Sequence, residues 1–296
     1  MKEIFEFRVN GDYAHLLFKA GEGKDLGGII VIHITKDDPR FEQIGEMQKM
    51  IDQKYDTYFF AGWDIVRKYT PEEIAEAKLF QFYINTMFEP PGEDCGTQYD
   101  ETVACEICGA GRKQITPLML RKSSIPKKDI ARTIAGEVVV SGRLAEAVQQ
   151  RLLTGIRLDP VLCRKGATGY YQPVALNEVD LSPKTLAGDD PFEKTYSCEA
   201  NTFTIQGYTF EDEAEVYVCP KGDLLGLACL SEVFVMDSPV LGKYDFFESQ
   251  QKFGVKRGDL RPEPAWLCSP AFYHMVKEEN FRGFTFEVAH IENNIS

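Results

Sequence analysis

The chain reads EVVVSGRLAEAVQQRLLTGIRLDPV over residues 137–161. Its β-branched start predicts a strand, and Ser141 is a candidate cap for a helix that follows. Gly155 then separates this helix from a second predicted strand at 156–161. The stretch therefore predicts a strand–helix–strand unit.

A second stretch, near the far end of the sequence, has the same spacing. Residues 265–289 read AWLCSPAFYHMVKEENFRGFTFEVA. Ser269 precedes Gly283 by 14 positions, as Ser141 precedes Gly155, and the offset between the stretches is 128 at both residues. We therefore predict that one supersecondary unit is used twice, with the two stretches as its first and second copies.

A Cys-x-x-Cys-Gly motif precedes the first copy, at Cys105, Cys108 and Gly109. This spacing predicts a tight turn, or knuckle, in which both sulfur atoms point at one ion, and the glycine permits the backbone conformation of the turn. Structural zinc takes four ligands in a tetrahedron, and Cys95 is the candidate third ligand. The fourth ligand stays open among four distant cysteines, which are Cys163, Cys198, Cys219 and Cys229.

Two alternatives to a zinc site follow from the same residues. The second copy is preceded by Cys219-Pro220-Lys221-Gly222, which looks like a knuckle that has lost its second cysteine. Zinc ribbons usually contain two intact cysteine pairs, so a turn that keeps two thiols without metal is one alternative. A thioredoxin-type redox motif is disfavoured because such a motif begins a helix, whereas the glycines that follow Cys108 predict a turn.

Composition limits the classes of partner and the compartment. The 296 residues carry a net charge of −13, and the 44% of hydrophobic residues is typical of a soluble globular protein. This charge disfavours nucleic acid and anionic membranes as partners, and it favours either solubility alone or a basic partner. Eight cysteines are too few for a disulfide scaffold. With neither a signal peptide nor an apolar run of membrane-spanning length in the sequence, we expect a cytoplasmic protein.

Glu89-Pro90-Pro91-Gly92 interrupts the hydrophobic pattern and predicts a domain boundary. We expect an N-terminal α/β domain over 1–90 and a knuckle-bearing pseudo-repeat domain over 91–296. The strands predicted first in the chain are 3–9, 13–19 and 28–35. The expected fold class is α+β, with mostly antiparallel sheets and a few flanking helices.

Acidic residues in two stretches are candidates for binding a basic partner, because charge complementarity speeds association and selects partners. They are Asp189, Asp190, Glu211, Asp212, Glu213 and Glu215. The sequence contains neither a Gly-x-Ser-x-Gly elbow nor a His-Glu-x-x-His motif, so no catalytic residue is assigned. The basic pairs at 112–113, 121–122 and 127–128 are interpreted as a solvated face, with nucleic-acid binding beside the knuckle as a weaker alternative.

From about residue 93 to residue 291, the chain resembles the double-CxxCG motif family, bacterial proteins similar to immunity factors encoded beside polymorphic toxins. The residues that carry the resemblance are 104–109, 129–130, 137–141, 153–155, 261–262, 268–269 and 283–290. The second Cys-x-x-Cys-Gly of that family is replaced here by residues 219–222, a departure from a complete family-type zinc site. The resemblance implies that the protein neutralises a cognate toxin by binding it. A hypothesis from another class is a zinc-dependent or thiol enzyme that uses Cys105 and Cys108.

Overall fold

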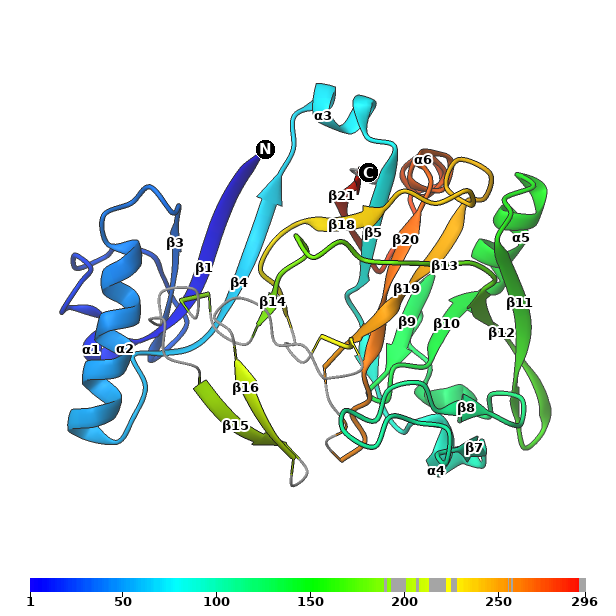
Figure 1. Ribbon diagram of the computed structural model, residues 1–296, viewed down its shortest axis with the longest axis horizontal. Helices are drawn as coiled ribbons and strands as arrows, with labels where there is room; N and C mark the ends of the chain where they lie inside the picture. Colours follow the sequence, from blue (N-terminus) through cyan, green and yellow to red (C-terminus); the bar gives the residue numbers. More distant parts are fainter. Residues whose placement is uncertain are drawn as a thin grey trace. The chain divides into compact units, whose positions relative to one another are not determined.

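The computed structural model describes residues 1–188, 191–192, 201–205, 208–212, 222–224, 228–254, 256 and 258–292. Its fold is α+β with mostly antiparallel sheets, as the sequence predicts. The chain divides into two compact units, Met1–Glu76 and Ala77–Ser296, which are called the N-terminal and C-terminal units below (Figure 1).

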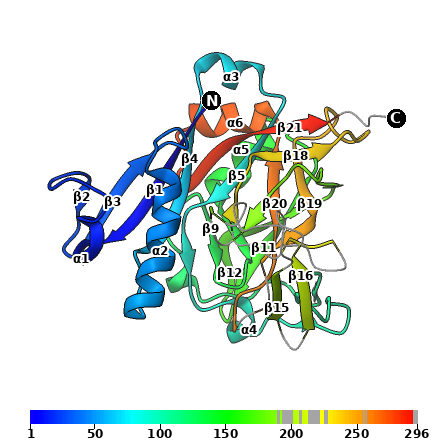
Figure 2. The same cartoon turned by 60° about the vertical axis from the view of Figure 1, so that its left-hand side comes forward.

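The N-terminal unit is a four-stranded sheet with one long helix packed on it (Figure 2). Its elements are β1 (Lys2–Asn10), α1 (Gly11–Ala14), β2 (Lys24–Asp25), β3 (Ile29–Ile34), α2 (Phe41–Tyr55), β4 (Phe60–Lys68) and α3 (Pro71–Glu76). The strand order is β2-β3-β1-β4, and β1 pairs antiparallel with both of its neighbours. The alternate residues Phe5, Phe7 and Val9 of β1 are buried. The ring centroid of Phe5 lies 4.6 Å from the ring centroid of Phe41 on α2. The period-two pattern of β1 thus forms the core of this unit.

The strand predicted at 13–19 is wrong. The chain forms the short helix α1 and then turns, because the side chain of Asn10 accepts a hydrogen bond from the amide of Asp12 at 3.1 Å. This is an N-cap, which starts a helix in place of continuing the strand. The strands predicted at 3–9 and 28–35 are confirmed as β1 and β3.

The C-terminal unit begins before the predicted boundary at residue 90. Strand β5 (Leu79–Ile84) pairs antiparallel with β20 (Glu263–Cys268) on one side and with β21 (Phe284–Glu292) on the other. The proline-rich break does follow β5, but pairing with strands about 200 residues away decides where β5 belongs. Residues 77–90 are therefore part of the C-terminal unit.

Two sheets form the body of the C-terminal unit. One has the order β11-β12-β10-β9-β6 and the other the order β13-β19-β20-β5-β21-β18. The first sheet contains β6 (Met87–Phe88), β9 (Ile130–Thr133), β10 (Val138–Ser141), β11 (Ile156–Cys163) and β12 (Gly166–Ala175). The second adds β13 (Glu178–Val179), β18 (Val233–Met236) and β19 (Phe246–Phe253) to β5, β20 and β21. Shorter elements are α4 (Gly92–Cys95), β7 (Tyr99–Asp100), β8 (Lys113–Gln114), η1 (Lys122–Ser124), β14 (Ala187–Gly188), β15 (Asn201–Ile205), β16 (Tyr208–Asp212) and β17 (Ala228–Cys229).

The predicted repeat is confirmed. Helix α5 (Gly142–Gln150) in the first copy and α6 (Pro270–Glu278) in the second have the same length and are 128 residues apart. Each follows a serine N-cap, and each is followed by a left-handed residue, with φ 54° at Leu152 and 53° at Asn280. Figure 1 shows the two helices at the same end of the C-terminal unit. There, Nη1 of Arg151 in the first copy donates a hydrogen bond to Oε2 of Glu278 in the second copy at 2.7 Å.

An aspartate before each copy joins the two copies to one another. Asp129 accepts hydrogen bonds from the hydroxyl of Ser141 in its own copy at 3.1 Å and from the amide of Arg282 in the other at 2.8 Å. Asp245 does the same with the hydroxyl of Ser269 at 2.7 Å and the amide of Thr154 at 2.8 Å. Because Thr154 and Arg282 are also 128 residues apart, the two junctions are equivalent. Each aspartate therefore binds both copies, and the two junctions are related by an approximate two-fold symmetry. We call this arrangement the interlocked repeat.

Candidate metal centre

The described residues bring three potential metal ligands together in the C-terminal unit: Cys105, Cys108 and Asp223. Their ligand atoms all lie within 4.8 Å of one another. The thiol of Cys108 is buried and donates a hydrogen bond to Oδ2 of Asp223 at 3.2 Å. Cys105 and Asp223 are partly exposed, so the cluster lies just beneath the surface.

The knuckle is a local turn, as its sequence predicts. The amide of Cys105 donates to the carbonyl of Ala110 at 2.7 Å, and the amide of Gly109 donates to the carbonyl of Cys105 at 2.8 Å. Gly109 has a φ of 78°, in the left-handed region that favours glycine. Strands β7 and β8 flank the turn and pair antiparallel, so the knuckle closes a hairpin.

The other ligand of the cluster comes from a distant part of the chain. Oδ1 of Asp223 accepts a hydrogen bond from the amide of Lys252, at the end of β19, at 3.0 Å. The amide of Lys256 donates to the carbonyl of Cys108 at 2.8 Å. The cluster therefore joins the β7–β8 hairpin to segments that lie more than 100 residues away in sequence.

The chemistry of these three groups fits a metal ion. Cysteine thiolates and an aspartate oxygen are established zinc ligands, and thiolates select against magnesium and calcium. Both thiols must lose their protons to bind, so any affinity depends on pH. Within the described part of the chain, the arrangement supplies three of the four ligands that a tetrahedral ion takes.

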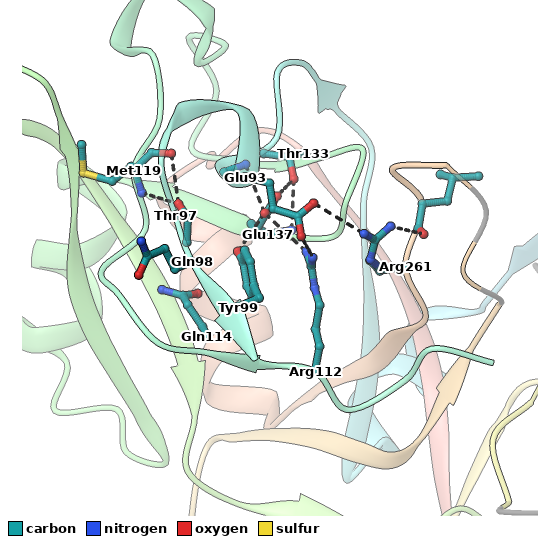
Figure 3. Close-up of polar contacts among 12 residues, drawn as sticks. Glu93, Thr97, Gln98, Tyr99, Arg112, Gln114, Met119, Thr133, Glu137 and Arg261 are labelled. Atoms are coloured by element: carbon teal, nitrogen blue, oxygen red, sulfur yellow. Dashed lines mark hydrogen bonds and ion pairs between the residues drawn. The ribbon is translucent and has the colours of Figure 1, made fainter. Parts of the chain in front are cut away.

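A network of charged and polar side chains lies in the same unit (Figure 3). At its centre is Glu137, which is 7% exposed and accepts hydrogen bonds from the hydroxyl of Tyr99 at 2.8 Å and the amide of Gly92 at 3.1 Å. Burial raises the pKa of Glu137 above its ordinary value, since the charged carboxylate loses its water. The guanidinium of Arg112 lies over the ring of Tyr99, 3.7 Å from the centroid, and pairs with Glu93.

The same network reaches the knuckle through Glu101. This carboxylate binds Arg112 at 3.2 Å and the ammonium of Lys256 at 3.3 Å. Burial opposes ionisation of Glu101, but hydrogen bonds from Arg112 and Lys256 outweigh it and lower the pKa. Because the backbone of Lys256 also binds Cys108, the network fixes the knuckle against the rest of the unit.

The structure places the third predicted ligand, Cys95, elsewhere. Cys95 ends α4 and lines a surface pocket together with Cys163, outside the cluster described above. The spacing of ten residues suggested Cys95, but α4 and the β7 strand that follows direct the chain to another part of the unit.

Sequence reasoning missed Asp223. The available signal was its position directly after Gly222, at the end of the degenerate second knuckle. A carboxylate can replace a thiolate as a zinc ligand, and Asp223 is one position after Gly222, which occupies the place of the lost cysteine.

The six acidic candidates for partner binding lie where the structure describes little. Asp189, Asp190, Glu213 and Glu215 are outside the described residues. Glu211 and Asp212 belong to β16, which pairs antiparallel with β15, and the description there is of the backbone.

Two comparisons bear on identity. Searches of protein-family models and of curated proteins found no match to this chain. In the part of the chain that the structure describes, no helix has both the length and the apolar character needed to cross a bilayer.

Proposed function

We propose that this chain is a cytoplasmic immunity-type protein that binds and neutralises a cognate toxin domain. Its acidic surface would face a basic toxin, and a zinc ion at Cys105, Cys108 and Asp223 would hold the scaffold together. The observation that carries the proposal is the cluster itself, which joins the Cys-x-x-Cys-Gly knuckle to Asp223, the residue that follows the degenerate second motif at 219–222 in sequence. Resemblance to the double-CxxCG motif family supplies the link to toxin neutralisation.

A structural role for the metal is supported by burial and connectivity. Cys108 is fully buried, and the cluster joins the β7–β8 hairpin to Asp223, 115 residues later in sequence. A metal at such a junction contributes its binding free energy to folding, because the unfolded chain lacks the assembled ligands. Zinc fits two thiolates and a carboxylate better than the other common divalent ions.

The partner surface is supported by charge. A net charge of −13 attracts a cationic protein and repels nucleic acid, so a basic toxin is the favoured partner class. The six acidic candidates at 189–190 and 211–215 would provide the complementary charge.

The proposal is tested by rescue from a candidate toxin encoded beside this protein's gene. A variant with the six acidic candidates changed to their amides is expected to lose rescue and direct binding. Its matched control changes six exposed acidic residues of the N-terminal unit: Glu42, Glu46, Asp52, Asp56, Glu72 and Glu76. Equal loss of toxin binding in the variant and in its control would show that only the total charge of the protein matters. If the wild-type protein itself fails to rescue cells from the toxin, the proposed function is refuted.

A zinc-dependent enzyme is the second candidate, since the residues that the structure describes bring three protein ligands together and Cys105 is partly exposed. Catalytic zinc sites have three protein ligands and keep one position for water. Cobalt substitution separates the two roles. An exchangeable water position changes the cobalt spectrum when azide is added, whereas a closed structural site leaves the spectrum unchanged.

A further inference from the structure

A surface pocket of the C-terminal unit is lined by four cationic side chains. It encloses about 700 Å³ between the end of α4, residues 119–123 and the turn from β11 to β12. The cationic residues are Arg121, Lys122, Arg164 and Lys165, and the one acidic residue of the lining is Asp94. The lining thus carries a local charge of +3 on a chain whose total is −13.

Backbone hydrogen bonds hold the walls of this pocket together. The amide of Leu162 donates to the carbonyl of Leu118, and the amide of Leu120 donates to the carbonyl of Leu162, both at 2.9 Å. The hydroxyl of Thr97 accepts from the amide of Met119 at 2.8 Å, which ties the end of α4 to the same segment. The cationic residues follow these paired segments directly, so the fold itself gathers them around one cavity.

The four cations have no carboxylate partners among the residues that the structure describes. This contrasts with Arg112, from the same basic stretch of sequence, which pairs with Glu93 and Glu101. Unpaired cations that line one cavity create a positive local potential, and such a potential concentrates anions. Guanidinium groups bind phosphate oxygens in a bidentate manner, and ammonium groups bind them as point charges.

We propose that this pocket binds a small ligand that carries two or more phosphate groups. Its volume lies within the range of about 300–1,000 Å³ that is typical of small-molecule sites. Two arginines and two lysines match the charge of a diphosphate, and Ser123 adds a hydroxyl to the lining. The site is separate from the metal centre and does not depend on the proposed toxin binding.

Inorganic pyrophosphate is the probe for this site, with calorimetry on the full-length protein as the first measurement. We expect one pyrophosphate per chain. The variant K122Q/R164Q is expected to weaken binding at least about tenfold, because it removes two charged contacts to the ligand. The matched control K127Q/K128Q removes the same charge from exposed residues outside the pocket and is expected to bind as the wild type does.

Alkylation locates the bound probe. Cys95 and Cys163 both line the pocket and are partly exposed, so pyrophosphate should slow their reaction with iodoacetamide. Cys229, which is also partly exposed but outside the pocket, serves as the internal standard.

Three results would overturn the proposal. The first is no calorimetric binding at millimolar pyrophosphate. The second is equal weakening by K122Q/R164Q and K127Q/K128Q, which would reveal a general charge effect. The third is tighter binding of a single-stranded oligonucleotide than of pyrophosphate at equal phosphate concentration, which would make the pocket part of a nucleic-acid surface.

Discussion

Asp129 offers a direct test of the interlocked repeat. Replacing it with alanine removes the acceptor for the hydroxyl of Ser141, for the amide of Arg282 and for the guanidinium of Arg143. Hydrogen bonds to a charged group contribute about 1.5–3 kcal/mol each when buried, and these are only partly buried. With about 0.2–1 kcal/mol for the exposed pair with Arg143, Asp129→Ala should lower the free energy of unfolding by about 2–3 kcal/mol.

Asp245, the equivalent aspartate of the second junction, gives a second and independent prediction. Asp245→Ala removes the equivalent acceptor for Ser269 and Thr154, so it should cost about 2–3 kcal/mol as well. Asp159→Ala is the control, because Asp159 pairs with Arg157 on the surface and both side chains are exposed. This control should change stability little.

Urea unfolding monitored by tryptophan fluorescence is the assay. A Trp63→Phe background leaves Trp266, on β20, as the reporter for the C-terminal unit.

The same variant also predicts a pH dependence. Burial opposes ionisation of Asp129, but hydrogen bonds from Arg143, Arg282 and Ser141 outweigh this effect and lower the pKa of Asp129.

The contribution of Asp129 should therefore be complete above its ordinary pKa of 3.8 and lost as pH falls through the lower folded-state value. The interlocked-repeat account fails if Asp129→Ala and Asp245→Ala cost no more than Asp159→Ala.

Three further predictions concern the knuckle, the glycines of the repeat and the buried carboxylate. Gly109→Ala should weaken zinc binding about tenfold more than Gly111→Ala does, as measured by competition with a chelator. A Cβ atom at residue 109 would lie 2.5 Å from the Cβ atom of Lys256, whereas a Cβ atom at residue 111 would have no neighbour within 4 Å. Equal effects would show that the positive φ common to both glycines is the whole cause. Gly155→Ala and Gly283→Ala should each destabilise the protein by over about 2 kcal/mol in urea unfolding, since their Cβ atoms would lie 2.8 Å from the Phe246 carbonyl oxygen and 2.5 Å from that of Ile130. Gly169→Ala carries only the backbone penalty of about 1 kcal/mol, and a similar loss in all three variants would contradict the close packing. Burial raises the folded-state pKa of Glu137 above its ordinary value of 4.5. The contribution of Glu137 to the free energy of unfolding is therefore fully present below pH 4.5, and it is lost as the pH rises through the folded-state pKa. Glu137→Gln should thus gain stability relative to the wild type across that window, by at most about 1.4 kcal/mol per pH unit, and parallel pH profiles would refute this.

Local signals in the sequence were sufficient for the repeat. The serine cap, the helix length and the glycine are properties of short segments, and the structure repeats them at an offset of 128. The knuckle turn was predictable for the same reason, because Gly109 and the two cysteines act within five residues. Neither prediction needed knowledge of distant contacts.

Long-range contacts were not accessible from the sequence. Strand β5 lies before the proline-rich break, yet it pairs between β20 and β21, and no local pattern encodes that pairing. The position of Asp223 after the degenerate second motif marks it as a candidate ligand, but only the fold shows that it lies beside Cys108. The cationic pocket was also not predicted. The basic pair at 121–122 was interpreted as part of a solvated face, and Arg164 and Lys165 belong to a distant segment that only the fold brings beside it.

Zinc content tests the metal centre most directly. The wild-type protein and Cys95→Ser, purified without chelators, are each predicted to contain one zinc ion per chain by elemental analysis. Cys105→Ser/Cys108→Ser should contain none, and Asp223→Ala should release zinc to a chelator that leaves the wild type loaded. A wild type that takes up no zinc, or equal loss of zinc from Cys95→Ser and Cys105→Ser/Cys108→Ser, would contradict a metal centre built from Cys105, Cys108 and Asp223.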